Sequence, residues 1–153
     1  MIEYIEIDES GIDQIKVLWE KLNESNKNKT KYFLQRFLNY SFEQRKAKIL
    51  EQANFSKMRI ELAKDSEKNS TVAYCVSSAD SKENGQILSI FVEEGYRTLG
   101  IGGNLMKHAL GWMDEIGVMS KRIDIVYGDE EAVPFCEKFG FYPQRLVLKQ
   151  ITK

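Results

Sequence analysis

The chain has 153 residues, of which 42% are apolar and 11% aromatic, and this suits one domain over residues 1–153 built around a single core. Twenty-two basic residues nearly balance 23 acidic ones, so the composition gives no general attraction to nucleic acid or to an anionic membrane. The first ten residues lack a cationic leader, and the two cysteines are too few for a disulfide framework and lack the spacing of a metal site. We therefore expect a cytoplasmic protein without metal, nucleic acid or membrane partners.

The N-terminal third of the sequence predicts one strand followed by helices. Glu3–Ile7 alternates apolar and acidic residues, as an edge strand does. Ser10 is a plausible N-cap for the helix that follows it, and the polar run Asn23–Thr30 is expected to end that helix. Tyr32–Gln52 is expected to form two helical pieces, the first of them aromatic and the second more charged.

The middle of the sequence predicts an antiparallel meander of three strands. Met58–Ala63, Thr71–Ser77 and Gln86–Val92 are rich in β-branched and aromatic residues. The polar turns Lys64–Ser70 and Asp80–Gly85 separate them. No linker or repeat interrupts this region, so nothing indicates a domain boundary.

The C-terminal half predicts alternating helices and strands. Ile101–Ile116 has apolar residues at helical spacing, and Arg122–Tyr127 follows it as a strand. A helix over Glu130–Phe139 and a last strand over Arg145–Ile151 complete the expected order.

A glycine-rich turn joins the strand that ends at Val92 to the helix that begins at Ile101. The first turn of a helix has unpaired N–H groups and the positive end of the helix dipole, so it can hold phosphate oxygens. Gly100, Gly102 and Gly103 remove the Cβ atoms that would hold a ligand away from this backbone, and Arg97 adds a permanent charge. A tight turn with close packing would explain the glycines equally well.

The order of these residues is more specific than the number of glycines. The arrangement of Val92, four intervening residues, Arg97 and then x-x-Gly-x-Gly-Gly resembles the pyrophosphate loop of the GNAT superfamily of N-acetyltransferases. Ala132–Phe141 is similar to a second block of that superfamily, a late helix and turn. The resemblance covers roughly residues 87–142. It implies a GNAT-like α/β fold: a mixed, mostly antiparallel sheet, splayed between its fourth and fifth strands and flanked by about four helices.

The resemblance implies acetyl-CoA as cosubstrate and an amine as acceptor. The acetyl group would pass directly from one to the other in a ternary complex. The pantetheine arm would bond the backbone of Ile90, Phe91 and Val92, where the strands part. The pyrophosphate would lie over the glycine-rich turn, with cofactor contacts from Arg97, Thr98, Leu99, Gly100, Ile101, Gly102, Gly103 and Asn104.

Three side chains are candidates for the chemistry. Cys136 occupies the place where the superfamily often has a tyrosine acid, although a lone helix cysteine is more often a small buried hydrophobe. Glu93, or its neighbour Glu94, could act as a base through water, or could be a solvated loop carboxylate. Tyr127 ends the fifth predicted strand, where it could pack or face the acyl group.

Further contacts to the cofactor are expected from the last helix and the residues before it. Asp129 could accept a bond from the pantetheine amide or cap the helix. Phe135 is expected beside the cofactor, and Lys138 is expected to meet a CoA phosphate or only water. His108 lacks a partner motif, and we interpret it as structural.

The acceptor cannot be assigned from the sequence, because the segments that build its pocket in the superfamily, here Asn23–Phe42 and Tyr142–Leu146, have no diagnostic motif. The aromatic residues of the first segment could line an amine site or form core. A small molecule and a peptide both fit, and a homodimer is compatible with this interpretation. A non-catalytic acyl-CoA sensor is the main alternative. A dinucleotide-binding protein fits poorly, because the glycine loop comes late and follows antiparallel strands.

Overall fold

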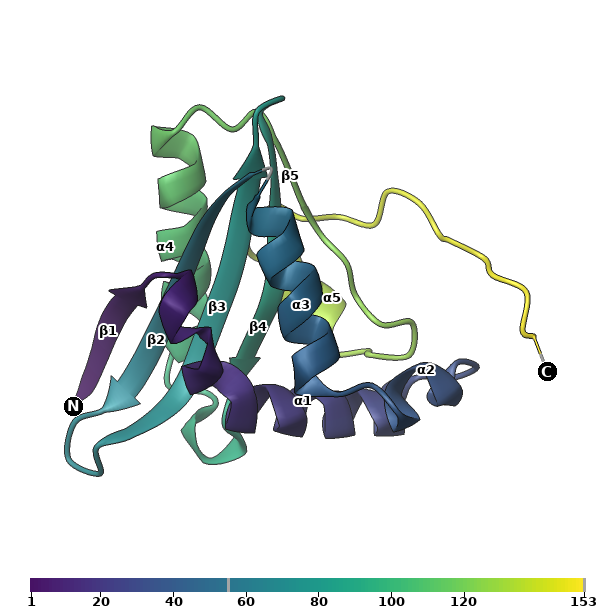
Figure 1. The fold of residues 1–153 in the computed structure, drawn as a ribbon, viewed down its shortest axis with the longest axis horizontal. Helices are drawn as coiled ribbons and strands as arrows, with labels where there is room; N and C mark the ends of the chain where they lie inside the picture. The colour runs from purple at the N-terminus through teal and green to yellow at the C-terminus, as the bar shows by residue number, and fades with distance from the viewer. Residues whose placement is uncertain (55, 153) are drawn as a thin grey trace.

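The computed structural model describes residues 1–54 and 56–152. A five-stranded sheet is covered by helices on both faces (Figure 1). The helices of the N-terminal half lie on one face, and those of the C-terminal half lie on the other. The elements, in chain order, are β1 (Ile2–Ile7), the 3-10 helix η1 (Glu9–Ile15), α1 (Lys16–Lys29), α2 (Leu34–Leu38), α3 (Phe42–Ala53), β2 (Ser56–Asp65), β3 (Ser70–Asp80), β4 (Asn84–Val92), the 3-10 helix η2 (Glu94–Tyr96), α4 (Ile101–Glu115), β5 (Ser120–Ile123) and α5 (Ala132–Glu137).

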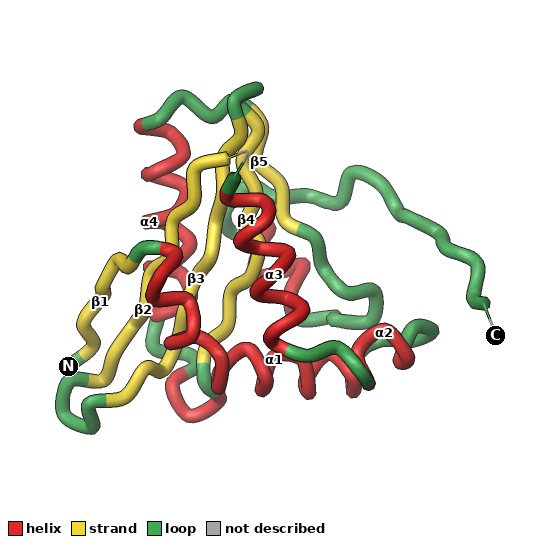
Figure 2. The backbone as a smooth tube through the Cα atoms, viewed as in Figure 1, coloured by secondary structure: helices red, strands yellow, loops and turns green. Residues whose placement is uncertain are grey.

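The strands lie side by side in chain order, β1-β2-β3-β4-β5. Neighbours from β1 to β4 pair antiparallel, and β4 pairs parallel with β5. The two middle hairpins are the predicted meander, because short polar turns can join only antiparallel neighbours. Figure 2 shows the sheet between the helices, and the GNAT-like α/β fold class is confirmed.

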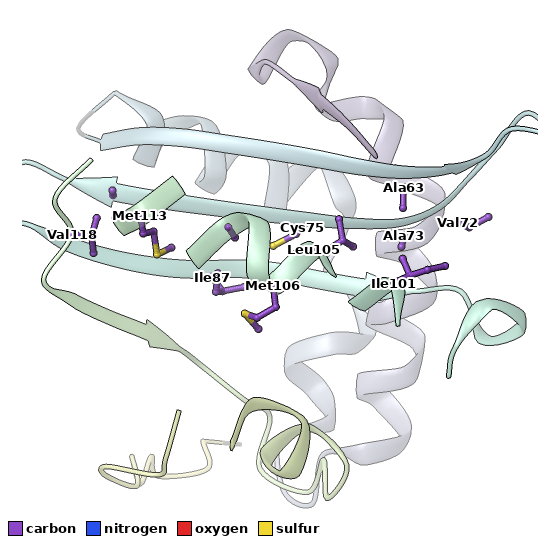
Figure 3. Close-up of a cluster of buried hydrophobic side chains, with 12 residues drawn as sticks. Ala63, Val72, Ala73, Cys75, Ile87, Ile101, Leu105, Met106, Met113 and Val118 are labelled. Atoms are coloured by element: carbon purple, nitrogen blue, oxygen red, sulfur yellow. The ribbon is translucent and has the colours of Figure 1, made fainter. Parts of the chain in front are cut away.

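Each face of the sheet has its own core, since successive side chains of a strand point to opposite faces. On one face, Tyr74 and Val76 of β3 pack against η1, α1 and α3. On the other, Ala73 and Cys75 pack against α4, whose buried stripe follows the predicted helical spacing (Figure 3). The sheet is therefore held from both sides, and its backbone position is well defined.

The splay between the fourth and fifth strands is present. β5 pairs with β4 only from Asn84 to Ile87, opposite Ser120–Ile123. From Leu88 to Val92, β4 continues alongside β3, but its other edge has no strand partner among the described residues. This free edge ends at the turn that leads into α4.

The first long helix, α1, ends at Lys29, within the polar run Asn23–Thr30, as predicted, whereas four other details differ from the sequence predictions. The N-cap is Asp8, whose carboxylate accepts the Ser10 N–H, so the predicted cap at Ser10 is wrong. β5 ends at Ile123 instead of Tyr127, and α5 is shorter than predicted at both ends. Residues 145–151 form no strand and lie exposed.

No helix among the described residues combines the length and the hydrophobicity needed to cross a membrane.

Candidate cofactor and acyl-transfer site

The free edge of β4 presents the backbone groups of alternate residues. Glu93 donates its N–H to Val72 of β3 at 2.8 Å, so odd-numbered residues here turn their backbone toward β3. Leu88 and Val92 turn theirs the other way, and their carbonyls accept from Arg45 at 2.8 Å and Arg97 at 3.0 Å. The backbone groups of Ile90 and Val92 therefore face the gap, and their bonds to a pantetheine arm stay a prediction.

Phe91 is the exception among the three residues expected to bond a pantetheine arm. Its backbone lies on the β3 side by the same alternation, and it pairs with Tyr74. Its ring is buried in the core on the α1 face, and the Arg97 guanidinium lies 5.4 Å from the ring centroid. Phe91 thus contributes a side-chain platform beneath Arg97 instead of a backbone bond.

The turn before α4 uses left-handed backbone at two positions. Thr98 has φ of 67° and Gly100 has φ of 80°. Glycine tolerates this region, whereas a β-branched threonine is rarely found there. Gly100 is the N-cap of α4 and makes no side-chain cap bond, so the first N–H groups of the helix remain available to a ligand. The unusual backbone and the uncapped helix start lie next to each other.

Gly102 and Gly103 lie beside side chains of other elements. A Cβ at Gly102 would lie 3.4 Å from Val92 and 3.5 Å from the ring of Phe135, and a Cβ at Gly103 would lie 3.6 Å from Phe139. These distances are ordinary van der Waals contacts, so both glycines border aromatic side chains of the α5 region without a steric need for glycine. Gly100 has no neighbour within 4 Å of its Cβ position, so it alone fits the predicted open approach.

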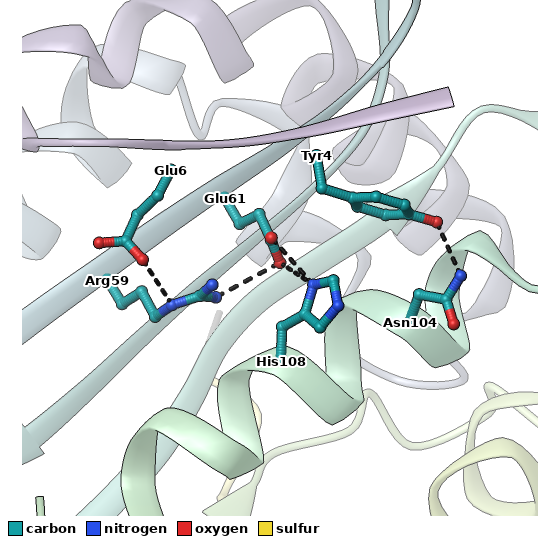
Figure 4. A network of polar contacts seen from close by, with 6 residues as sticks. All are labelled: Tyr4, Glu6, Arg59, Glu61, Asn104 and His108. Atoms are coloured by element: carbon teal, nitrogen blue, oxygen red, sulfur yellow. Dashed lines mark hydrogen bonds and ion pairs between the residues drawn. The ribbon is translucent and has the colours of Figure 1, made fainter. Parts of the chain in front are cut away.

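A polar network fastens α4 to the first two strands (Figure 4). Asn104 donates its amide to the Tyr4 hydroxyl at 2.9 Å. One turn later, His108 Nδ1 lies 2.9 Å from both oxygens of Glu61, which is buried and also contacts Arg59. The helix that opens at the candidate phosphate site is thus held in place along its length by β1 and β2.

Glu93 lies where β4 ends, and a lysine of α1 holds it. Lys21 Nζ lies 2.8 Å and 2.7 Å from the two carboxylate oxygens of Glu93. The Glu93 side chain is 29% exposed, so this pair is in contact with water. Lys21 is a site residue that the sequence analysis missed, because its only signal is a place on the polar side of α1.

Cys136 is buried, with 3% of its surface exposed. Burial raises the pKa of its thiol, and the nearby Asp129 carboxylate raises the pKa further. The thiol therefore keeps its proton at neutral pH.

Asp129 is occupied by contacts within the protein. Its carboxylate accepts the Ala132 N–H at 3.3 Å and lies 3.4 Å from Lys29 Nζ, although the N-cap of α5 is Glu131. Beside it, a Cβ on Gly128 would lie 2.0 Å from the Lys29 carbonyl oxygen, and the φ of Gly128 is 115°. The end of α1 therefore packs directly against the backbone before α5.

Tyr127 lies on the same contact between α1 and the segment after β5. It is 57% exposed and stacks on Tyr32, with ring centroids 6.4 Å apart and planes 14° from parallel. Lys31 Nζ lies 5.1 Å from the Tyr127 centroid. These contacts hold an exposed phenol near the parted strands. Lys138, by contrast, is an exposed residue at the C-cap of α5.

No group of three or more histidine, cysteine or acidic side chains within the described residues could hold a metal ion.

Parallel strands that part beside an uncapped, glycine-rich helix start define a domain of the acetyltransferase class. Residues 18–141 match the Acetyltransferase (GNAT) family, and the chain belongs to this family.

Solved structures share the fold at low sequence identity. An acetyltransferase of the GNAT family from Staphylococcus aureus Mu50 has a TM-score of 0.75 at 16% identity, over 95% of this chain and 87% of its own. An aminoglycoside acetyltransferase from an uncultured soil metagenomic sample, in complex with sisomicin, gives 0.70 at 18%, over 99% and 97%. Glucosamine-6-phosphate N-acetyltransferase from Arabidopsis thaliana gives 0.65 at 12%, over 100% and 99%. No curated protein matches the chain.

Proposed function

We propose that the protein transfers an acetyl group from acetyl-CoA directly to an amine in a ternary complex. The observation that carries the proposal is the free edge of β4, which leads straight to the uncapped N-terminus of α4. A thioester ligand with an amide-containing arm and a pyrophosphate needs these two features in this order.

The cofactor would bind along β4 and over the turn. Its pantetheine amides would bond the outward backbone of Ile90 and Val92, as an added strand does. Its pyrophosphate would accept from the N–H groups over residues 99–103, since the Asn104 N–H already donates to the Gly100 carbonyl at 3.0 Å. Arg97 now donates to the Val92 carbonyl and is exposed, so it can turn to a phosphate when the pantetheine amide takes over that carbonyl.

The reaction would need no covalent enzyme intermediate. A neutral amine attacks the thioester carbonyl, a backbone N–H at the end of β4 stabilises the oxyanion, and the C–S bond breaks as the carbonyl re-forms. We assign Glu93 to accept the amine proton through water. Cys136 would return a proton to the CoA thiolate through a bridging water, which suits a thiol that stays protonated.

The acceptor would enter opposite the cofactor, between α1–α2 and the segment after β5. The stacked Tyr32 and Tyr127 are exposed there, and aromatic faces attract cationic amines. Lys31 already lies over Tyr127 and would be displaced or would contact anionic groups of the acceptor. Two structural neighbours are an aminoglycoside acetyltransferase and a glucosamine-6-phosphate N-acetyltransferase. Their amine acceptors support the proposal that this protein also acts on an amine.

The proposal can be tested with purified protein, acetyl-CoA and pools of amines and peptides. Acceptor-dependent thiol release, with a mass increase of one acetyl group on one amine, is the expected result. Calorimetry on Arg97→Glu should show at least a tenfold loss of CoA affinity through charge repulsion, about 1.4 kcal/mol. Lys107→Glu reverses an exposed charge farther along α4 and should bind CoA normally.

Two outcomes would contradict the proposal. CoA binding without thiol release for any amine would favour a non-catalytic acyl-CoA sensor. Equal CoA affinity of Arg97→Glu and the unmodified protein would remove the turn before α4 from the cofactor site.

A further inference from the structure

A guanidinium lies at the closed end of the gap between the parted strands. β4 and β5 pair last at Ile87 and Ile123, and the gap opens at Leu88. The Leu88 carbonyl accepts a hydrogen bond from Arg45 Nη2 at 2.8 Å. Arg45 belongs to α3, which lies in front of β4 in Figure 1 and packs on the same face of the sheet as α1. Its side chain therefore reaches the gap from the face where the acceptor is proposed to enter.

The backbone at Leu88 is irregular, and this explains why its carbonyl is free to bond a side chain. The register of β4 with β3 passes from Ile87 to Ser89 and skips Leu88. Such a bulge leaves the extra residue outside the ladder of strand bonds. Arg45 supplies the missing partner with one N–H, and a guanidinium carries several N–H donors in a planar fork. No second hydrogen bond of the Arg45 side chain occurs within the described part of the chain, so most of these donors remain for a ligand.

The charge of Arg45 has no acidic partner in the protein. Within residues 1–54 and 56–152, no carboxylate lies at ion-pair distance from its guanidinium. The residue is half-buried, so part of its hydration is already lost and an anion would be a favourable partner. The guanidinium fork matches a carboxylate or a phosphate, which it can bind through two parallel N–H···O bonds.

The neighbouring sequence is also positively charged. Residues 25–42, from the second half of α1 to the start of α3, include four basic residues and no acidic one, although the whole chain has a formal net charge of −1. Two of the four pair with carboxylates, whereas Lys31 and Arg36 have no acidic partner among the described residues. The acceptor side of the domain would therefore attract a molecule that carries negative charge.

We propose that the acceptor is an amine that also carries a carboxylate or phosphate group, and that Arg45 binds this anionic group. This assignment rests on the proposed acetyl transfer and names the class of its acceptor. The anionic group would lie at the closed end of the gap, and the amine would face the thioester. Arg45 would thus determine specificity without taking part in the chemistry, and amines that carry only positive charge would be disfavoured.

The first test compares acceptors that differ only in charge. Amino acids are paired with their carboxamides, and aminoalkyl phosphates with the corresponding amino alcohols, in an assay of thiol release from acetyl-CoA. In at least one pair the charged member should have a kcat/KM at least tenfold higher than the neutral member. The pair that shows this preference distinguishes a carboxylate from a phosphate. An aminoglycoside, which carries several ammonium groups, should be a poor acceptor.

The second test assigns the preference to Arg45. Arg45→Gln should raise KM for the charged acceptor at least tenfold and leave KM for its neutral partner and the affinity for CoA unchanged. Arg45→Lys keeps the charge without the fork and should recover part of the preference. Lys46→Gln is the matched control, because it removes a charge from the next position of α3, where Lys46 Nζ lies 2.7 Å from Asp13. A purely structural role of the bond to Leu88 would instead impair both acceptors alike.

Two results would overturn the proposal while acetyl transfer itself is confirmed. Neutral amines could be acetylated as well as their charged partners, or Arg45→Gln could keep the preference for the charged acceptor. Arg45→Lys provides the same comparison if circular dichroism shows that Arg45→Gln does not fold.

A failure of the proposed function has a different signature, which is the absence of thiol release with every amine. Calorimetry on the complex with CoA then decides about Arg45. The charged member of a pair should still bind more tightly than the neutral member, and Arg45→Gln should abolish the difference. Equal binding of the two members, or no binding of either, would overturn the proposal.

Discussion

Tyr96 donates its phenolic hydrogen to the Asp65 carboxylate at 2.6 Å. Asp65 ends β2, and Tyr96 ends the 3-10 turn just before Arg97, so the bond joins the β2–β3 hairpin to the start of the turn before α4. Asp65 also accepts backbone N–H groups from Glu67 and Lys68 within that hairpin. A residue of a distant strand, Asp65, therefore helps to position this turn.

Tyr96→Phe should weaken CoA binding about threefold to tenfold, because the turn before α4 loses its anchor and must be ordered by the ligand, at a cost of about 1 kcal/mol. Calorimetric titration with CoA would measure the change. Tyr142→Phe removes a hydroxyl from a 70% exposed tyrosine and serves as control. Equal affinity in both variants would show that the bond does not support the turn.

The same bond predicts a dependence of stability on acid. The hydrogen bond from Tyr96 lowers the pKa of Asp65 in the folded state, helped by the backbone N–H groups. A lowered folded pKa stabilises the protein above the unfolded value, about 3.9, and this stabilisation is lost as pH falls through the folded pKa. Asp65→Asn should be less stable than the unmodified protein at pH 6, and the gap should shrink toward pH 3. Urea unfolding at several pH values would measure it, and a gap independent of pH would contradict the assignment.

Glu93→Gln should lower kcat about tenfold or more, with CoA affinity unchanged, since an amide cannot accept the amine proton. Glu94→Gln changes the adjacent, exposed carboxylate and should keep full activity. The loss in stability from breaking the Lys21 pair should stay below about 1 kcal/mol, because the pair is partly exposed. Steady-state kinetics would measure kcat of both variants. If Glu93→Gln were as active as Glu94→Gln, solvent and not Glu93 would remove the amine proton.

Cys136→Ala should lower kcat about tenfold, roughly 1.4 kcal/mol of barrier, and leave acetyl-CoA affinity nearly unchanged. The raised pKa of Cys136 keeps the donor protonated above the ordinary thiol value of about 8.5, so the activity of the unmodified protein should persist past that pH. Cys75→Ala is the matched control, because this second buried cysteine lies in the α4-side core. A full rate for Cys136→Ala at every pH would make Cys136 a packing residue only.

Gly128→Ala should destabilise the protein by about 2 kcal/mol, because its φ is unfavourable for alanine and the new Cβ would overlap the Lys29 carbonyl. Gly111→Ala is the opposite control: a Cβ there meets nothing within 4 Å, and alanine favours a helix. Thermal unfolding would measure both. The Gly128 variant should still bind CoA, since the turn before α4 is not part of the contact between Gly128 and Lys29. A loss of CoA binding would show that the two sites are coupled.

The sequence predicts best what depends on local patterns. Apolar alternation located the meander, and helical spacing located α4 and its start beside Gly100. The motif around Arg97 indicated the family because the turn requires particular residue types at fixed spacing within one short stretch of sequence. The sequence predictions failed where local patterns leave two choices open. Ser10 and Asp8 are both good N-cap residues, and only the fold selects Asp8.

Contacts between distant residues could not be predicted. Lys21 meets Glu93 across 72 positions, and a helix-surface lysine has no signature of its partner. Gly102 was interpreted as an open approach, although Phe135, far along the chain, fills the space beside it. Residues 145–151 have the composition of a strand but form none in the structure, because a strand also needs a pairing edge that local composition does not specify.

The contact of Gly128 with Lys29 and the turn before α4 belong to different segments of the chain. The cofactor side is continuous in sequence, from β4 through α4, so a change there disturbs several of its features at once. The opposite side joins the end of α1 to a loop about one hundred positions away, and the short stretch 30–41 between α1 and α3 carries little of the core. Evolution could therefore exchange this stretch to suit a new acceptor while the cofactor machinery stays intact. Grafting loops of other lengths between Lys29 and Phe42 is accordingly a practical route to altered selectivity.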